Sequence, residues 1–372
     1  MYGTRGRCGP LASRGVLAST GAPVRVATRP AQFPWTLLRR SVARFSWLAL
    51  AATACAPAAE PEVVVYVSVD QVFAQSILEG FTDESGIRVR AVYDTEATKT
   101  TGLANRLLAE KSAPHADVFW NSEIVRTLVL DREGVLAPYL SPSAAEIPPA
   151  YRDPEGRWTG FAARVRVIAV NTALLPRSEW PAGVVELGDA RWKGRVAMAY
   201  PLFGTTSTHV AALFAAWGPE RGSAWLRSLA ANDIRVVDGN ATARDLVVGG
   251  SVPLALTDSD DVAAARARGD AIEMIFPDAQ GEGSLVIPNS VALIAGAPHP
   301  VEGRRLIDFL LSPRVEIALS RLPGAQIPLR PGLPWPDALP PRESLRPMPV
   351  DYGALASQLP AAMAAAREIF VR

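Results

Sequence analysis

A junction that recurs five times constrains the fold more than any other feature of the sequence. At each one a short apolar run ends in Ser, Thr, Asn or Asp, an amphipathic run follows, and a Gly closes it. This is the order of a strand, a helix N-cap, a helix and a helix stop. The junctions fall at Ser68, at Asn121 or Ser122, at 205–208, at Asn240 and at Asp258. The helices expected after the first four cover residues 71–85, 123–133, 209–217 and 241–248, and the fifth helix ends at Gly269.

Strands that alternate with helices at this spacing predict parallel α/β sheets. In such sheets the ligand crevice lies beyond the carboxyl ends of the strands, facing the helix N-termini. The polar residues of the five junctions are therefore expected to converge on one site.

Two long apolar runs, 160–175 and 283–300, are expected to be strands that connect two α/β lobes into a hinged molecule. Residues 302–321 read as helices, and a Pro-rich tail precedes a last helix near 353–370. The expected lobes are 62–163 plus 288–330, which form a discontinuous first lobe, and 164–287, with 331–372 as tail and C-terminal helix.

The N-terminus has the pattern of a targeting segment. Residues 1–54 contain eight Arg and no Asp, Glu or Lys, and the basic residues Arg39, Arg40 and Arg44 precede an apolar run at 45–54. We expect residues 1–54 to be removed on export, as an N-terminal extension and signal peptide. Small residues followed by Cys55 resemble a bacterial lipobox and predict lipidation of Cys55, with 55–61 as a tether; a plain secretory signal is the alternative.

Charge and cysteine content narrow the function classes. The whole chain has a formal charge of +1, but without residues 1–54 it has 30 basic and 37 acidic residues, a net charge of −7. So acidic a chain is a poor candidate for binding nucleic acid. The second cysteine, Cys8, lies in the removed segment, so the mature chain is expected to form no internal disulfide.

Several stretches together resemble a known family. "VVVYVSVDQVFAQSILEGF", "ADVFWNSE", "GTTSTHVAAL" and "PNSVALIAGAPHPVEGRRLIDFLLSP" look like the extracellular solute-binding proteins of ABC importers, the ferric-iron-binding group being the nearest. The resemblance covers about residues 62–325. It implies a two-lobe periplasmic-binding-protein fold of type II, each lobe a mostly parallel sheet flanked by helices. It also implies a non-catalytic, monomeric protein that passes a ligand to a membrane permease from the periplasm or from a lipid anchor on the outer face of the cytoplasmic membrane.

The resemblance also implies positions for a metal ligand set. Where iron-binding members have adjacent tyrosines this chain has Asp260 and Asp261, and the sequence contains no tyrosine between Tyr200 and Tyr352. Glu123 and Asp70 match two further ligand positions. With Fe(III) as the transported ligand, the expected metal residues are thus Asp70, Glu123, Asp260 and Asp261, and the site of the synergistic anion matches 204–208.

Other polar residues have two readings each. The hydroxyls of Thr205, Thr206, Ser207 and Thr208 at a helix start form a candidate anion cradle or only an N-cap. Ser68, Asn121 and Asn240 are candidate donors to the same anion or simple caps. Arg244 is either an anion ligand or an ion-paired surface residue. Asp258, Asp260 and Asp261 are either ligand-binding or first-turn carboxylates that favour the helix dipole.

Two ligand classes follow for a binding protein. One is Fe(III), a hard cation suited to oxygen ligands, held with a synergistic anion. The other is an organic oxyanion such as a sugar phosphate or phosphonate, which the missing tyrosines favour slightly. No resident cofactor is expected. A sensor that docks on a signalling receptor is an alternative function. A secreted hydrolase is disfavoured, because a G-x-S-x-G elbow and a reactive Cys are missing and Ser207 and His209 diverge on one helix.

Overall fold

One mixed sheet runs through the residues that the structure, a computed structural model, describes: 60–94 and 101–371. The sheet has ten strands in the order β2-β1-β3-β10-β5-β8-β6-β7, with β4 paired to β10 and β9 to β5. The strands are β1 Glu62–Val67, β2 Arg88–Tyr93, β3 Val118–Asn121, β4 Leu136–Ala137, β5 Thr159–Asn171, β6 Val196–Ala199, β7 Arg235–Val237, β8 Leu254–Asp258, β9 Ile272–Ile275 and β10 Val286–Ile294. The described residues belong to one compact unit by their contacts. The predictions for 1–54 and Cys55 lie outside the described residues.

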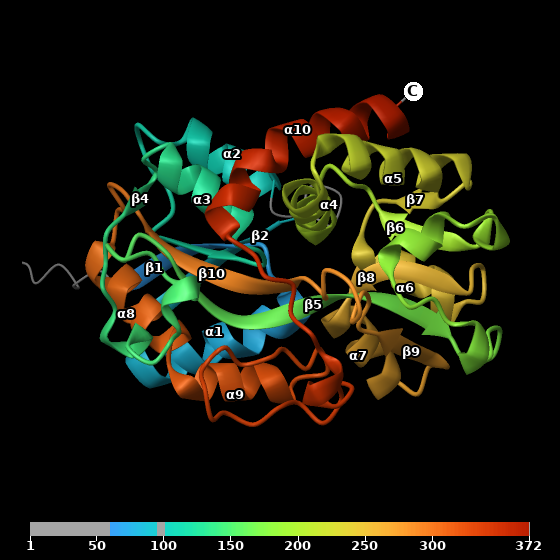
Figure 1. The fold of residues 1–372 in the computed structure, drawn as a ribbon. Coiled ribbons are helices and arrows are strands. Elements are labelled where there is room, and N and C mark those ends of the chain that lie inside the picture. Colours follow the sequence, from blue (N-terminus) through green and yellow to red (C-terminus); the bar gives the residue numbers. More distant parts are fainter. Residues whose placement is uncertain (1–59, 95–100, 372) are drawn as a thin grey trace, which may run out of the picture. The chain divides into compact units, whose positions relative to one another are not determined.

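Each end of the sheet is a parallel group of three strands. At one end β1 lies between β2 and β3, and at the other β6 lies between β7 and β8, all in parallel. Strands β10 and β5 join the two groups and run antiparallel to each other and to β3 and β8 (Figure 1). These are the two long strands predicted at 160–175 and 283–300. The parallel groups are confirmed, and the two joining strands make the whole sheet mixed.

Ten α-helices cover the sheet in the described part of the chain. They are α1 Gln71–Ser85, α2 Thr101–Ala109, α3 Val125–Arg132, α4 Gly204–Trp217, α5 Pro219–Ala231, α6 Asn240–Val248, α7 Ser259–Ala267, α8 Pro300–Leu310, α9 Pro313–Arg321 and α10 Tyr352–Phe370. The predicted helices at 71–85, 302–321 and 353–370 are confirmed. Gly86 closes α1 in the left-handed conformation, with φ of 69°, which a residue without Cβ adopts at no steric cost.

Two helix starts differ from the prediction for a local reason. Helix α3 begins at Val125 and not at Glu123, because the Glu123 carboxylate accepts hydrogen bonds from the backbone N–H groups of Val125 and Arg126 and so caps the helix. Helix α4 begins at Gly204, five residues before the predicted start, so the polar residues 205–208 form its first turn. The side chains at a junction, and not only its apolar pattern, set where each helix starts.

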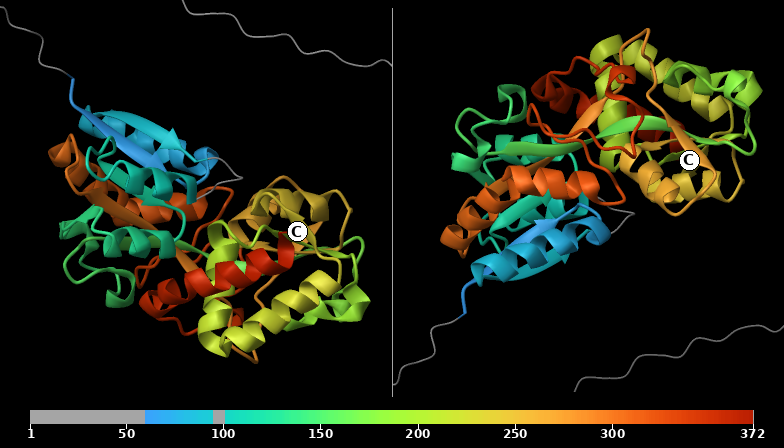
Figure 2. Two further views of the ribbon diagram at one scale, coloured as in Figure 1. Left: turned by 90° about the horizontal axis from the view of Figure 1, so that it is seen from above. Right: turned by 90° about the horizontal axis from the view of Figure 1, so that it is seen from below.

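Helix α10 lies across both groups of strands. It packs on α4 and α5, which belong to the β6–β8 end, and on α3, which follows β3 (Figures 1 and 2). Its buried face carries Leu355, Leu359 and Ala362. Helix α4 is enclosed by these neighbours, which explains why its residues from Thr205 to Phe214 are all buried. Among the described helices, none combines the length and the hydropathy that crossing a membrane requires.

Candidate functional site

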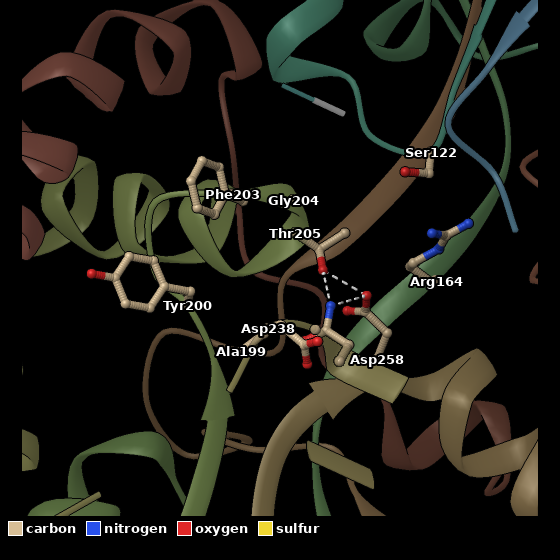
Figure 3. A pocket seen from close by; sticks show the side chains of 11 residues that line it. Ser122, Arg164, Ala199, Tyr200, Phe203, Gly204, Thr205, Asp238 and Asp258 are labelled. Carbon is tan, nitrogen blue, oxygen red and sulfur yellow. Dashed lines mark hydrogen bonds between the residues drawn. The ribbon is translucent and has the colours of Figure 1, made fainter. Parts of the chain in front are cut away.

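A pocket forms where the first turns of α4 and α6 meet the middle of β5 and the loop after β3 (Figure 3). Its lining combines hydroxyl, amide, carboxylate, guanidinium and aromatic groups. The residues are Ser122, Arg164, Ala199, Tyr200, Phe203, Gly204, Thr205, Asp238, Gly239, Asn240 and Asp258. Residues of four of the five predicted junctions thus lie around one pocket, which is the convergence that the strand-to-helix pattern predicts.

Two arginines project from the same face of β5. Arg164 and Arg166 are two residues apart, so their side chains share one face of the strand while Val165 and Val167 pack on the other. Both arginines are almost fully buried, with exposed fractions of 3% and 0%. A buried guanidinium requires counter-charges and hydrogen-bond acceptors, because desolvation of an unpaired charge costs several kcal/mol. The surroundings of each arginine therefore define the polar structure of the site.

Arg166 is held by a closed network with Asp258. Its Nη1 donates to Asp258 Oδ1 at 2.8 Å and to Thr205 Oγ1 at 3.0 Å. The other carboxylate oxygen, Oδ2, accepts from the Thr205 hydroxyl at 2.6 Å and from Asn240 Nδ2 at 3.0 Å (Figure 3). Arg166 Nη2 reaches the Thr206 hydroxyl at 3.3 Å. Strand pairing brings the two charges together, because Arg166 lies opposite Asp258 in the β5–β8 ladder.

Arg164 lies nearer the pocket and is less completely bonded. Its Nη2 donates to Asn289 Oδ1 at 2.8 Å, and its Nε lies 3.2 Å from Asp260 Oδ2, an ion pair whose angle is not that of a hydrogen bond. Burial alone disfavours the charged guanidinium, but the carboxylates of Asp260 and Asp258 outweigh this and raise the pKa of Arg164. Asp70 contributes to the same effect. Arg164 is therefore a fixed positive charge beside Ser122.

The four hydroxyls at the start of α4 bond to protein groups. Thr205 and Thr206 join the Arg166 network, and Ser207 donates to the Gly204 carbonyl at 2.8 Å. Thr208 donates to Glu123 Oε2 at 3.0 Å, so a hydrogen bond links α4 to the start of α3. A ligand in the pocket meets the backbone of this turn more directly than its hydroxyls.

The backbone at the start of α4 retains hydrogen-bonding capacity. Ser207 N–H makes the first bond of the turn, to the Phe203 carbonyl at 3.1 Å. The N–H groups of Gly204, Thr205 and Thr206 precede it, and no acceptor for them is found among the described residues. Helix α6 presents its own first turn at Gly239 and Asn240 to the same pocket. Two helix N-termini, with their partial positive charge, thus face one space.

The residues after β1 and β3 form a second hydrogen-bonded group. Ser68 donates to Asn121 Oδ1 at 2.6 Å and accepts from the Ser122 backbone N–H at 2.9 Å. The Asn121 amide donates to Thr127 at 3.0 Å. Glu123 is fully buried, and burial raises the pKa of its carboxyl even though Arg126 opposes the shift. Ser68 and Asn121 thus fix the position of Ser122, which lines the pocket.

Three of the five predicted carboxylates lie together. Asp258, Asp260 and Asp261 place one oxygen each within 4.8 Å of one another, and no other group of three or more potential metal ligands is found in residues 60–94 and 101–371. Asp70 and Glu123 are not in that group. Asp261 accepts from Thr257 at 3.1 Å and lies 3.6 Å from Arg244.

Arg244 lies outside the pocket lining. Its ion pairs are with Asp261 and with Asp245, at 2.7 Å. Of its two predicted roles, the described contacts are those of an ion-paired arginine.

The reading of Asp258 as the side-chain cap of its helix is wrong. Asp258 occupies the N-cap position of α7, but its side chain makes no capping hydrogen bond, because both carboxylate oxygens bond to the Arg166 network. Ser259 does not cap either: its hydroxyl accepts from the Val165 N–H of β5 at 3.0 Å. Asp260 lies in the first turn, paired with Arg164.

Six residues of the pocket lining were not predicted as site residues: Arg164, Ala199, Tyr200, Phe203, Asp238 and Gly239. Arg166 beneath the pocket was also missed. The signal for the arginines was present, since two charges at alternate positions interrupt the apolar run "FAARVRVIAV" of a buried strand. Tyr200 and Phe203 stack with ring centroids 5.9 Å apart, and the Tyr200 hydroxyl points away from Asp258 (Figure 3). Tyr200 thus does not replace the missing tyrosine pair in this arrangement.

Comparisons with known proteins agree with this architecture. A family model described as "Bacterial extracellular solute-binding protein" matches residues 117–347. The "Fe(3+)-binding periplasmic protein" of Serratia marcescens is 29% identical over 271 residues, which are 71% of this chain and 78% of that protein. The "Putative 2-aminoethylphosphonate-binding periplasmic protein" of Salmonella typhimurium is 27% identical over 295 residues, 76% of this chain and 83% of that protein.

The same fold occurs in solved structures. Iron-bound HitA from Pseudomonas aeruginosa is 25% identical and superposes with a TM-score of 0.76, covering 84% of this chain and all of that one. The type II two-lobe fold predicted from the resemblance is confirmed.

Proposed function

Because the chain belongs to the family of bacterial extracellular solute-binding proteins, which serve ABC importers, we propose that its pocket captures an organic oxyanion of the phosphonate or sugar-phosphate class. The observation that carries this choice is Arg164. It is a buried, charged arginine that lines the pocket together with Ser122 and the first turn of α4. An arginine in such a place favours a phosphate or carboxylate group, which its planar fork binds with two parallel hydrogen bonds.

The main chain supports the same ligand class. Backbone N–H groups at the start of α4, with Gly239 and Asn240 of α6 beside them, offer donors and the positive end of two helix dipoles. Asp238 lies at the rim of the pocket and is exposed, which suits an amine or hydroxyl elsewhere on the ligand. The Ser68–Asn121 pair would hold Ser122 as a donor from the opposite side.

Fe(III) is the second candidate, and the cluster of Asp258, Asp260 and Asp261 favours it. These carboxylates are hard oxygen ligands within 4.8 Å of one another, and relatives are named for iron binding. Each carboxylate, however, pairs with an arginine: Asp258 with Arg166, Asp260 with Arg164 and Asp261 with Arg244. A ferric ion at this cluster would have to compete with these arginines, which makes the oxyanion the better fit.

The remaining roles follow from family and sequence. The protein binds its solute outside the cytoplasmic membrane and delivers it to an ABC permease. We also propose that the first lobe comprises residues 62–163 and 288–330 and the second lobe residues 164–287. We propose further that the protein is a monomer and that lipidation of Cys55 anchors it to the membrane. The family is one of extracellular solute-binding proteins that serve transport.

A thermal-shift screen of residues 56–372 tests the ligand class, since this part contains the whole compact unit. The panel is inorganic phosphate, hexose phosphates, 2-aminoethylphosphonate and other phosphonates, and ferric citrate compared with iron-free citrate. A bound ligand stabilises the fold by RT ln(1 + [L]/Kd), about 2.7 kcal/mol at a concentration of 100 Kd. Stabilisation by an organic oxyanion is expected, and a response to the ferric salt alone would exclude the proposal.

The variant Arg164→Gln tests the residue that carries the proposal. Loss of a buried charge-assisted contact is expected to weaken ligand binding by about 30-fold or more, measured by calorimetric titration. Arg268→Gln is the matched control, because Arg268 is an exposed arginine that lies outside the pocket lining. Equal affinities of the two variants would rule out a direct role of Arg164.

A further inference from the structure

We infer that the Asp258 carboxylate acts as an internal anion at the start of α4. It accepts the side-chain hydrogen bonds of Arg166, Thr205 and Asn240, which could otherwise bind an anion from outside. The sequence left two readings for Thr205 and Asn240, as donors to an anion supplied from outside or as simple helix caps. In the structure both donate instead to Asp258 Oδ2, at 2.6 and 3.0 Å, while Arg166 donates to Oδ1 at 2.8 Å. Three donors converge on one carboxylate of the chain itself.

The chemistry of this group is that of an anion site. A buried guanidinium, a hydroxyl and an amide are the partners that small oxyanions take in proteins. The carboxylate is 3% exposed and the guanidinium 0%, so their charges compensate each other away from water. Asp258 also leaves the capping of α7 to make these bonds. A residue at an N-cap would ordinarily bond to its own helix, so the network has displaced a local interaction.

The placement has a consequence for the ligand. With Asp258 in the cradle, a bound oxyanion has Arg164, Ser122 and the backbone of Gly204 and Thr205 as partners, and not Arg166 or the threonine hydroxyls. No separate small anion is then needed to complete the site. The list of partners for the ligand rests on the proposed function. The role of Asp258 as an internal anion does not depend on the proposed function.

The variant Asp258→Ala tests the inference through chemical rescue by formate. The substitution removes one carboxylate and leaves Arg166, Thr205 and Asn240 around the vacated space. Sodium formate is expected to raise the melting temperature of this variant saturably, by roughly 2 °C or more, relative to sodium chloride of equal ionic strength. The parent chain, whose cradle is filled, should show no such rise.

Two matched variants control the experiment. Asp258→Asn keeps the volume of the side chain, so formate has no space to enter and should not stabilise it. Asp245→Ala removes an exposed aspartate that also pairs with an arginine, and it should not respond to formate. If Asp258→Ala is insoluble, the soluble yield on refolding is compared with and without formate, and a gain with formate is expected.

The inference is overturned if Asp258→Ala gains nothing from formate in either assay, or if the parent chain gains as much. The ligand screen separates this outcome from a failure of the proposed function. In one outcome formate rescues Asp258→Ala while no organic oxyanion stabilises the parent chain. That result would support the inference about Asp258 and reject the proposed ligand class. Ligand binding without rescue would do the reverse.

Discussion

At the scale of residues, the two arginines of β5 have different surroundings although they share a strand face. Arg166 is enclosed by Asp258, Thr205, Thr206 and Asn240. Arg164 has a side-chain hydrogen bond to Asn289 and an ion pair with Asp260, and it borders the pocket. The difference assigns Arg166 to holding the site together and leaves Arg164 available to a ligand.

The sequence predicted where polar residues would gather, but not their partners. Helix signals placed Asp258 at the start of a helix, where capping is the ordinary local interaction. Its partners Arg166 and Thr205 are 92 and 53 positions away and meet it only through the sheet. Interactions between residues so far apart leave no periodic pattern in the sequence. Local helix signals therefore predict where Asp258 lies but not which side chains it bonds to.

A pH-dependent contribution is expected from Asp278, at the turn after β9. Its carboxylate accepts the Val184 N–H at 3.2 and 3.3 Å, and burial raises its pKa from 3.8 to about 6 in spite of that bond. Because the pKa is higher in the folded state, the contribution to stability is complete below pH 3.8 and is lost as the pH rises through about 6.

The variant Asp278→Asn removes this titration and suits the backbone, since φ at this residue is 61° and Asn tolerates that region. Relative to the variant, the free energy of unfolding of the parent chain should fall between about pH 4 and pH 7 in urea titrations. A difference that stays constant over this range would contradict the assigned pKa.

At the scale of elements, helices with a clear glycine stop were predicted well and helix starts less well. The ends of α1, α4 and α6 fall at Gly86, Gly218 and Gly249, as predicted. The starts of α3 and α4 were displaced because Glu123 caps one helix by its side chain and because residues 205–208 were read as a cap and not as helix. A glycine ends a helix through its own backbone conformation, whereas the start of a helix depends on which side-chain hydrogen bonds form there.

Helix α10 is expected to stabilise the molecule by packing on α4. Leu359 is buried on the face of α10 that belongs to the same apolar cluster as Val210 and Leu213 of α4. The substitution Leu359→Ala should lower the free energy of unfolding by about 2–5 kcal/mol, from lost burial and the cavity left behind. Urea denaturation measures this, with Glu368→Ala on the exposed face as control. Equal losses for both variants would show that α10 is not packed as described.

At the scale of the whole molecule, the site is assembled from residues that lie far apart in the sequence. Ser122 follows β3, Arg164 lies on β5, and Gly204 and Asn240 begin helices after β6 and β7. A hydrogen bond between Thr208 of α4 and Glu123 before α3 ties the two groups of strands beside the pocket. We expect ligand binding to close the two groups on the pocket, with the joining strands β5 and β10 as the hinge. The sequence motifs predicted the family and the convergence of the junctions on one pocket. The choice of ligand depends on how the charged side chains pair in the fold, which the motifs do not predict.

A crystal structure of residues 56–372 with the most stabilising ligand of the screen is the most direct test of the central claim. We expect an oxyanion within hydrogen-bonding distance of the Arg164 guanidinium and of a backbone N–H at Gly204 or Thr205, with Asp258 still bonded to Arg166. A ferric ion coordinated by Asp258, Asp260 or Asp261, with Arg166 displaced from Asp258, would contradict it.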